Sequence, residues 1–225
     1  MKKRLIVAID GPAGSGKSTV THLLAKRLGY THIDTGALYR SIALRAFRQG
    51  VTIEDEEKLG TIAESAKLEF RWIQGRNHIF MDGEDVSSKI RTPEISMAAS
   101  KISAHPKVRN ALLGLQRQMG ESGGAVLEGR DIGTVVFPNA DVKFYLTATV
   151  DSRARRRMVE LEDKGLYSEF EEVKKQVVER DRGDMERKVA PLKKADDAIE
   201  VDTTEMTVEE VVAFLVDTVK SKEGK

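Results

Sequence analysis

The chain has 225 residues, 40% hydrophobic and 32% charged, which is typical of a globular protein that can bury a full core. Lysine and arginine (37) nearly balance aspartate and glutamate (36), so we expect neither nucleic acid nor an acidic membrane as a partner. The lack of cysteine excludes disulfides and thiolate chemistry, and no apolar run has the length of a signal peptide or membrane span. We therefore expect a cytosolic protein.

The first predicted element is a buried strand over residues 4–9, and a glycine-rich segment follows it. This segment has the phosphate-loop pattern G-x-x-x-x-G-K-[ST] and consists of Gly11, Pro12, Ala13, Gly14, Ser15, Gly16, Lys17, Ser18 and Thr19. Backbone N–H groups of such a loop cradle phosphate, Lys17 would neutralise the outer phosphates of ATP, and Ser18 would ligate Mg²⁺. A glycine-rich turn without a ligand is the alternative. The strand before the loop and the helical pattern after it favour the phosphate site.

Strand-like runs continue along the chain at residues 31–34, 125–128, 142–147 and 198–202, separated by helical patterns. This alternation predicts an α/β fold with a parallel sheet of five strands, covered by helices on both faces. The last helix is marked by a capping-box pair, Thr207 and Glu210, ahead of valines at helical spacing.

The gap between the second and third strands is longer than one crossover helix requires. Runs 68–73 and 78–81 flank a turn at 74–77, and Asp82-Gly83 offers a second turn, so a small antiparallel meander is predicted. Prolines then open two helices. We place an inserted lobe at 61–103 and assign 1–60 and 104–225, with the helix at 106–120, to the core. The lobe could carry the site for a phosphate acceptor, and a contact between subunits is the alternative role.

Polar residues follow the ends of two predicted strands. Because ligands bind beyond the carboxyl ends of strands in an open parallel sheet, the first group is expected at a ligand site: Asp34, Thr35, Tyr39 and Arg40. Arg130 and Asp131 follow the third strand in the same way. The alternatives are a core position for Tyr39, a solvated Arg40, and a simple salt bridge for Arg130 with Asp131.

Two charge-dense segments lie farther along the chain. Arg153, Arg156 and Arg157 share a helix face, and a second cluster runs over 180–188. With the stretch 164–167 they are typical of a lid, placed at 150–168, that brings arginines over a transferred phosphate. A solvated helix face is the alternative for the first segment.

The chain offers no Ser-His-Asp or Cys-His set, and its four histidines are scattered. An acceptor that is itself a phosphate monoester needs no base, because its second pKa is near 6 and it arrives largely ionised. The arginines therefore favour transfer onto a phosphate. Asp34 is the carboxylate that could act as a base instead, and we favour a role for it near a magnesium-bound water.

Four blocks together resemble the bacterial cytidylate kinases, a family of nucleoside monophosphate kinases among the P-loop proteins: Gly11–Thr19, Ile33–Arg40, Glu128–Pro138 and Val189–Leu192. The resemblance extends over nearly the whole chain. It implies a five-stranded parallel core with an enlarged acceptor-binding insertion and a short lid. It also implies transfer of the γ-phosphate of ATP to CMP or dCMP with magnesium, by a monomer.

The resemblance further implies roles for individual residues. Ser100, Arg109 and Asp131 would read cytosine, and Asp184 would bond the sugar hydroxyls. The residues implied to hold the acceptor or its phosphate are Thr35, Tyr39, Arg40 and Arg130. Those implied to reach the transferred phosphates are Arg180 and Arg187, with Arg156 or Arg157 serving from the lid.

The sequence departs from the family pattern in two places. Thr35 stands where serine is expected, and Gly183 and Met185 fall where charge is frequent. A P-loop kinase for AMP, UMP, dTMP or a small metabolite is the nearest competing interpretation. A GTP-dependent switch would need an Asn-Lys-x-Asp motif, which the chain lacks, and a nucleic-acid-binding protein would need interleaved aromatics beside the arginines.

Overall fold

The computed structural model describes residues 4–163 and 165–223 of the chain. These residues form two compact units. The first combines the chain up to His32 with the chain from Gly123 onward, and the second is Ile33–Ser122.

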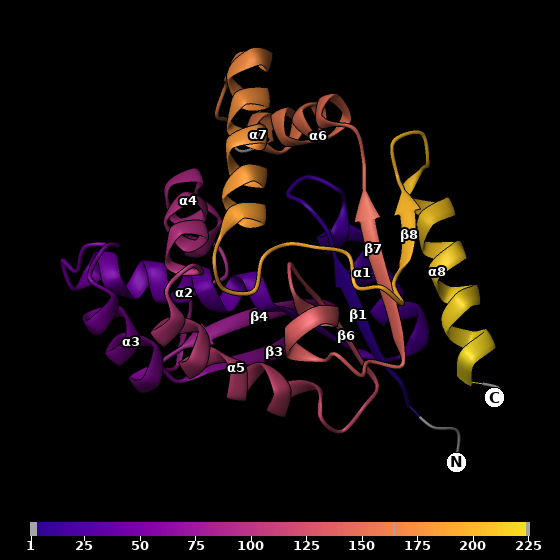
Figure 1. The fold of residues 1–225 in the computed structure, drawn as a ribbon, viewed down its shortest axis with the longest axis horizontal. Coiled ribbons are helices and arrows are strands. Elements are labelled where there is room, and N and C mark those ends of the chain that lie inside the picture. The colour runs from indigo at the N-terminus through magenta and orange to yellow at the C-terminus, as the bar shows by residue number, and fades with distance from the viewer. Residues whose placement is uncertain (1–3, 164, 224–225) are drawn as a thin grey trace. The chain divides into compact units, whose positions relative to one another are not determined.

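A five-stranded sheet organises the first unit, with the strand order β2-β6-β1-β7-β8 (Figure 1). Strand β1 pairs in parallel with both β6 and β7, and β7 pairs in parallel with β8. The strands are Ile6–Asp10 (β1), Thr31–Asp34 (β2), Ala125–Gly129 (β6), Val142–Thr147 (β7) and Ile199–Asp202 (β8). The predicted α/β class and the five predicted strands are confirmed, with boundaries that differ by one or two residues.

Helices α1 (Lys17–Leu28) and α8 (Val208–Glu223) cover one face of this sheet. Alternate residues of β1, such as Val7 and Ile9, contribute to the buried cluster that these helices share with β7. Because side chains alternate between the faces of a strand, the intervening residues of β1 point to the opposite face. The predicted capping box starts α8: Thr207 N donates to Glu210 Oε2 at 2.8 Å, and Glu210 N donates to Thr207 Oγ1 at 3.3 Å.

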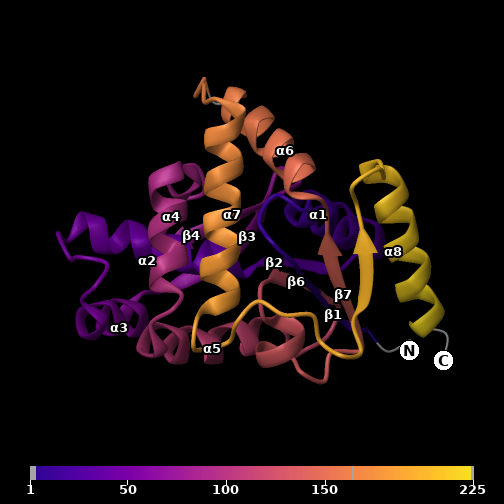
Figure 2. The same cartoon turned by 45° about the horizontal axis from the view of Figure 1, so that its top comes forward.

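Two packed helices, α6 (Val150–Glu162) and α7 (Phe170–Glu186), lie beyond the carboxyl end of β7 (Figures 1 and 2). Their contact is a small buried cluster formed by Ala154, Leu161 and Val173. The predicted arginine-dense helix is therefore present as α6. Lys164, which belongs to the predicted lid, lies outside the described residues. A π-helical segment, η2 (Ile132–Val136), follows β6.

The second unit contains helices and a three-stranded antiparallel sheet in the order β3-β4-β5. Its elements are α2 (Thr35–Arg48), α3 (Glu56–Ser65), β3 (Leu68–Ile73), β4 (Arg76–Met81), β5 (Glu84–Asp85), η1 (Lys89–Arg91), α4 (Pro93–Ile102) and α5 (Pro106–Gly120). The predicted meander is thus present. Its first turn is shorter than expected: Gln74 and Gly75 have φ of 49° and 75° and connect the strands as a two-residue hairpin loop.

The second unit is wider than the predicted lobe at 61–103. Helix α5, which we expected to return to the core, buries Val108 and Leu112 in the same apolar cluster as Leu38 of α2 and Leu59 of α3. The apolar residues predicted to form the buried side of α5 are buried, but their spacing does not indicate which other elements will cover them. The buried side chains of α2 and α3 likewise belong to this cluster rather than to the one around β1.

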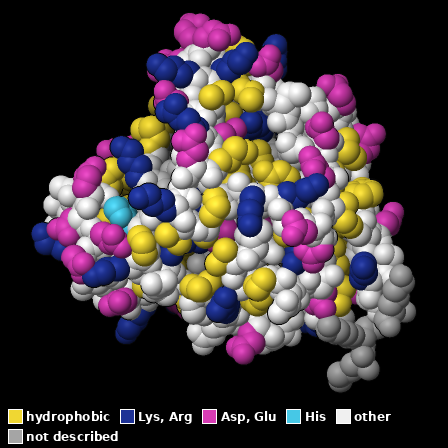
Figure 3. Space-filling view, in the orientation of Figure 1, with side chains coloured by type: hydrophobic (Ala, Val, Ile, Leu, Met, Phe, Trp, Pro, Cys, Tyr) yellow, Lys and Arg dark blue, Asp and Glu magenta, His cyan; other side chains and the backbone are white. Residues whose placement is uncertain are grey.

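Basic and acidic side chains are interspersed on the face of the molecule shown in Figure 3. This agrees with the nearly balanced charge of the sequence. Among the described residues, no helix combines the length and the apolar character that crossing a membrane requires.

Candidate active site

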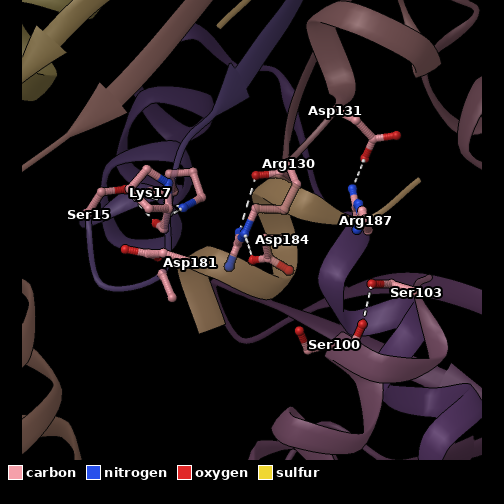
Figure 4. Close-up of polar contacts among 12 residues, drawn as sticks. Ser15, Lys17, Ser100, Ser103, Arg130, Asp131, Asp181, Asp184 and Arg187 are labelled. Carbon is pink, nitrogen blue, oxygen red and sulfur yellow. Dashed lines mark hydrogen bonds and ion pairs between the residues drawn. The ribbon is translucent and has the colours of Figure 1, made fainter. Parts of the chain in front are cut away.

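The phosphate loop connects β1 to α1, as its sequence predicts, and Lys17 is the first residue of the helix. The Lys17 side chain is buried, its ammonium donates to the Pro12 carbonyl at 2.6 Å, and it lies 3.2 Å from Ser15 Oγ (Figure 4). Burial, together with the nearby charge of Arg130, holds the pKa of Lys17 well below its ordinary value. A bound phosphate would add to the negative charge that Glu128 and Asp10 already bring near this side chain.

Ser18, the predicted metal ligand, is in contact with a buried carboxylate. Its hydroxyl donates to Glu128 Oε2 at 2.7 Å, and His32 Nε2 lies 2.9 Å from Glu128 Oε1. A hydroxyl and a carboxylate are hard oxygen donors of the kind that Mg²⁺ prefers. Glu128 was not among the predicted site residues, although its position at the end of a strand beside the phosphate loop was a usable signal.

Arg153 was predicted as one of the arginines on a helix face above the transferred phosphate, but no specific contact was assigned to it. Its guanidinium is buried, donates to the carbonyls of Ala148 (3.0 Å) and Ala13 (3.1 Å), and pairs with Asp181 of α7 at 2.6 Å. The phosphate loop fits closely against this side chain. Gly14 has φ of +75°, and a Cβ there would lie 3.0 Å from Arg153 Cβ. Arg153 therefore connects the phosphate loop with α6 and α7.

The other two arginines of α6 have different surroundings. Arg156 donates to Thr203 Oγ1 at 2.9 Å, and Thr203 Oγ1 in turn lies 3.3 Å from the Ser15 carbonyl of the phosphate loop. Arg157 forms a 2.8 Å pair with Glu160 one turn along the same helix, where Glu160 is largely exposed. Arg156 is thus linked to the phosphate loop through one residue, whereas Arg157 makes a surface ion pair.

Arg130 and Asp184 form an ion pair between the end of β6 and α7 (Figure 4). Arg130 Nε donates to Asp184 Oδ2 at 2.7 Å, and the Asp184 side chain is only 5% exposed. Burial opposes ionisation of both groups. The charge of Asp184 nevertheless raises the pKa of Arg130, and Arg130 with Arg180 holds the pKa of Asp184 below its ordinary value. The alternative pairing of Arg130 with Asp131 is not the one observed.

Asp131 lies next to a different arginine. Arg187 Nη2 is 3.4 Å from Asp131 Oδ1, while Arg187 Nε donates to the carbonyl of Ala190 at 2.7 Å (Figure 4). The segment after α7 folds back on the helix, since Leu192 N donates to the Asp184 carbonyl at 2.8 Å. Favourable charge interactions and hydrogen bonds therefore connect several predicted site residues of the first unit: Arg130, Asp131, Arg180, Asp184 and Arg187.

The remaining predicted residues belong to the second unit. Asp34 caps α2, because its carboxylate accepts from Ala37 N at 3.0 Å, and it pairs with Arg40 at 2.7 Å. Thr35 starts the same helix and is buried. Tyr39 is part of the apolar cluster of this unit, as its core interpretation allowed.

Arg109 of α5 is buried, and its guanidinium lies 5.7 Å from the centroid of the Tyr39 ring. It donates to the carbonyl of Ser103 at 3.2 Å. Ser103 Oγ in turn donates to the carbonyl of Ser100, one of the predicted base readers, at 2.7 Å (Figure 4). Tyr39, Arg109 and Ser100 are thus connected within one unit.

Fold and site together define an α/β protein of the P-loop kinase type. Among solved structures, a similar fold is found in an uncharacterized protein from Eubacterium ventriosum (TM-score 0.52, 11% identity, 97% of this chain and 99% of that one). Shikimate kinase from Acinetobacter baumannii is also similar (TM-score 0.50, 16% identity, 100% and 97%).

The sequence comparisons define the family. The family described as cytidylate kinase matches residues 7–221. The cytidylate kinase of Syntrophotalea carbinolica is 48% identical over 99% of this chain and 95% of its own length. That of Citrifermentans bemidjiense is 50% identical over 97% and 94%. The chain belongs to the cytidylate kinase family.

Proposed function

We propose that this protein transfers the γ-phosphate of ATP to CMP or dCMP, giving ADP and CDP or dCDP. The observation that carries this proposal is the set of buried, mutually paired charges beside the phosphate loop, in a chain that matches cytidylate kinases over nearly its whole length. Lys17 and the guanidinium groups of this set would supply positive charge to phosphoryl transfer, and the carboxylate of Asp131 could read a base.

The phosphate loop would hold ATP. Its backbone N–H groups and the start of α1 would bind the phosphates, and Lys17 would reach the outer ones. Mg²⁺ would be held by the Ser18 hydroxyl, which hydrogen-bonds to Glu128. Asp34 would contact the ion through a bound water. When bound, the ion would neutralise charge on the β- and γ-phosphates.

Arginines would stabilise the phosphoryl group during transfer. We assign this role to Arg130, Arg180 and Arg187, with Arg156 and Arg157 acting from the lid at 150–168. The buried pairing of Arg130 with Asp184 supports the assignment, because it fixes a guanidinium whose donors would otherwise be mobile. No protein base is required, since the acceptor phosphate arrives largely ionised.

The acceptor nucleotide would be bound through its phosphate, its sugar and its base. Thr35, Tyr39, Arg40 and Arg130 would hold its phosphate and the adjoining atoms, and Asp184 would bond the sugar hydroxyls. Ser100, Arg109 and Asp131 would read the base. Cytosine presents an exocyclic amine to a carboxylate, whereas uracil presents a carbonyl there and leaves the carboxylate unpaired. The inserted lobe at 61–103 would carry part of this acceptor site.

We also infer that the enzyme acts as a monomer in the cytosol and uses small-molecule substrates alone. Sedimentation of the purified protein with and without substrates would test the monomer.

The proposed reaction is tested by ADP release from magnesium-ATP with CMP, dCMP, UMP, AMP, GMP and dTMP as acceptors. Strong turnover with CMP and dCMP and little with UMP would support both the reaction and the base-reading role of Asp131. Turnover confined to another acceptor would keep the kinase chemistry and overturn the cytosine site. No turnover with any of them would overturn the proposal.

A further inference from the structure

Asp10, the last residue of β1, is a buried carboxylate that the reaction scheme above does not use. Its side chain is 4% exposed. Asp10 Oδ1 accepts from Ile132 N at 2.8 Å, and Oδ2 accepts from Gly133 N at 2.7 Å. These N–H groups are the first two of η2, which directly follows Arg130 and Asp131. The Asp10 carboxylate thus connects the end of β1, directly before the phosphate loop, to the segment that follows the proposed acceptor contacts Arg130 and Asp131.

The surroundings of this bridge leave little space. Asp10 shares its face of the sheet with Lys143 of β7, opposite the face covered by α1 and α8. Gly133 is enclosed by these two side chains: a Cβ there would lie 3.1 Å from Lys143 Cδ and 3.4 Å from Asp10 Oδ2. A side chain at position 133 would therefore crowd Lys143 and Asp10.

The far end of the same segment is also fixed. Lys143 donates to the carbonyl of Pro138 at 2.5 Å and to Asp197 at 2.8 Å. Within the segment, the Asp131 carbonyl accepts from Val135 N at 2.9 Å and Val136 N at 3.1 Å. Since Asp131 is held by its own carbonyl inside this turn, the position of its side chain depends on where η2 is anchored.

Only an ionised carboxylate offers an acceptor oxygen to both N–H groups. An asparagine would satisfy one of them and point its own NH₂ group at the other. Burial raises the pKa of Asp10 to about 6, assisted by the charge of Asp131 and opposed by the two N–H donors and by Lys17. The ionised group is therefore kept in place by directed hydrogen bonds in a site that disfavours charge.

We propose that Asp10 is a positioning residue for phosphoryl transfer, which holds Arg130 and Asp131 in register with the phosphate loop through the N–H groups of Ile132 and Gly133. The inference rests on the proposed function to the extent that Arg130 and Asp131 bind the acceptor. It adds a coupling between the donor and acceptor sites through residues more than 120 positions apart, since the two hydrogen bonds span 122 and 123 residues.

The test compares Asp10→Asn with Asp141→Asn. Asp141 is a matched control because its Oδ2 accepts from Ile6 N at 2.8 Å, the same type of bond at the opposite end of β1. Both variants remove a carboxylate from a strand-anchoring role. KM for CMP, KM for ATP, kcat and the preference for CMP over UMP are measured for each, with thermal unfolding as the stability reference.

Asp10→Asn should raise KM for CMP by about tenfold and reduce the preference for CMP over UMP by a similar factor, because a small misplacement of a binding group has effects of this size. KM for ATP should change by less than about twofold. Asp141→Asn should leave all four kinetic quantities unchanged. Equal changes in both KM values, no kinetic change in a folded Asp10→Asn variant, or the same kinetic change in Asp141→Asn would overturn the proposal.

A second variant covers the case in which Asp10→Asn does not fold. Gly133→Ala keeps the Asp10 charge but adds a Cβ that crowds Lys143 Cδ and Asp10 Oδ2 where they face η2. A rise in KM for CMP is therefore expected, and an unchanged KM would overturn the proposal. The proposed function fails separately, in the unmodified protein, if CMP is not its preferred acceptor. The variants are then assayed with the acceptor that it does use, and the same selective rise in acceptor KM is expected.

Discussion

At the scale of single residues, the site is defined by how its buried charges are paired. Arg130 pairs with Asp184, and Arg187 lies beside Asp131. A buried charge whose partner is removed is costly, whereas an exposed ion pair contributes little. The pairing therefore predicts that removing a carboxylate from either buried pair will lower stability, whereas breaking an exposed pair will have little effect.

Asp131→Ala should raise KM for CMP and reduce the preference for CMP over UMP by about 10- to 100-fold, the effect of losing one directed hydrogen bond to the base. ATP affinity should stay nearly unchanged, because the phosphate loop is untouched. Competition between CMP and UMP in one coupled assay measures the preference, and Asp196→Ala at an exposed position is the control. A collapse of ATP binding would show that Asp131 is assigned to the wrong substrate.

Asp184→Asn should lower the free energy of unfolding by about 3 kcal/mol at neutral pH, since Arg130 is left without its carboxylate. Glu200→Gln, which breaks the exposed pair with Lys194, should cost about 0.5 kcal/mol or less. Urea unfolding of both variants measures the difference. Similar losses for the two would contradict the buried-pair argument.

The effect of Asp184→Asn should also depend on pH. Arg130 and Arg180 hold the pKa of Asp184 below its ordinary value of 3.8, although burial opposes them. The folded state therefore favours the ionised form, and this stabilisation is present above pH 3.8 and is lost as pH falls through the lower folded pKa. The difference in stability between the unmodified protein and Asp184→Asn should shrink in that acidic range.

At the scale of elements, helix α6 is held to the phosphate loop by one buried side chain. Arg153 reaches the Ala13 carbonyl from α6 and pairs with Asp181 of α7, so one guanidinium connects three elements. A planar fork with five donors can make these contacts together, whereas a lysine ammonium is a single point of charge. Helices α6 and α7 are therefore joined at Arg153, whose guanidinium also binds the phosphate loop.

Arg153→Lys should lower the free energy of unfolding by about 2 kcal/mol and raise KM for ATP several-fold, because hydrogen bonds to Ala148 and Ala13 are lost. Arg182→Lys makes the same chemical change at an exposed position on α7 and should alter neither quantity. Urea unfolding and ATP titration of the two variants test the prediction. An unchanged KM for ATP in Arg153→Lys would show that the contact between α6 and the phosphate loop does not affect ATP binding.

At the scale of the whole molecule, the chain forms two compact units with separate apolar clusters, and the phosphate loop belongs to the first. Ligand binding to the folded state alone adds to stability by mass action. The free protein carries Lys17 in a site that disfavours its charge, so a bound phosphate should stabilise the fold through this residue.

Lys17→Ala should lower kcat by orders of magnitude while the fold survives, because the buried ammonium contributes charge to transfer rather than stability to the free protein. A non-hydrolysable ATP analogue at 100 times its Kd should stabilise the unmodified protein by about 2.7 kcal/mol and Lys17→Ala much less. Lys194→Ala, at an exposed position, should behave as the unmodified protein. Full activity in Lys17→Ala would contradict the role assigned to the phosphate loop in phosphoryl transfer.

Much of the fold was predictable because its signals are local. The phosphate-loop pattern, the capping box of Thr207 with Glu210 and the apolar strand runs each depend on residues within one or two turns of the chain. These features depend on local backbone geometry and do not require knowledge of how the elements pack. The arginine-dense helix was predictable for the same reason, but not the three different surroundings of Arg153, Arg156 and Arg157.

The sequence by itself determined the α/β class and the phosphate loop, because these follow from periodicity and from a contiguous motif. It also indicated the kinase family, through the resemblance of four blocks to known members. Only the tertiary structure decided that Arg130 pairs with Asp184, that α5 joins the second unit, and that Asp10 anchors η2. Each of these depends on which strands become neighbours and which groups lose water. Partners 54 to 123 residues apart are joined by the packing of the sheet and helices, and no local pattern records that distance.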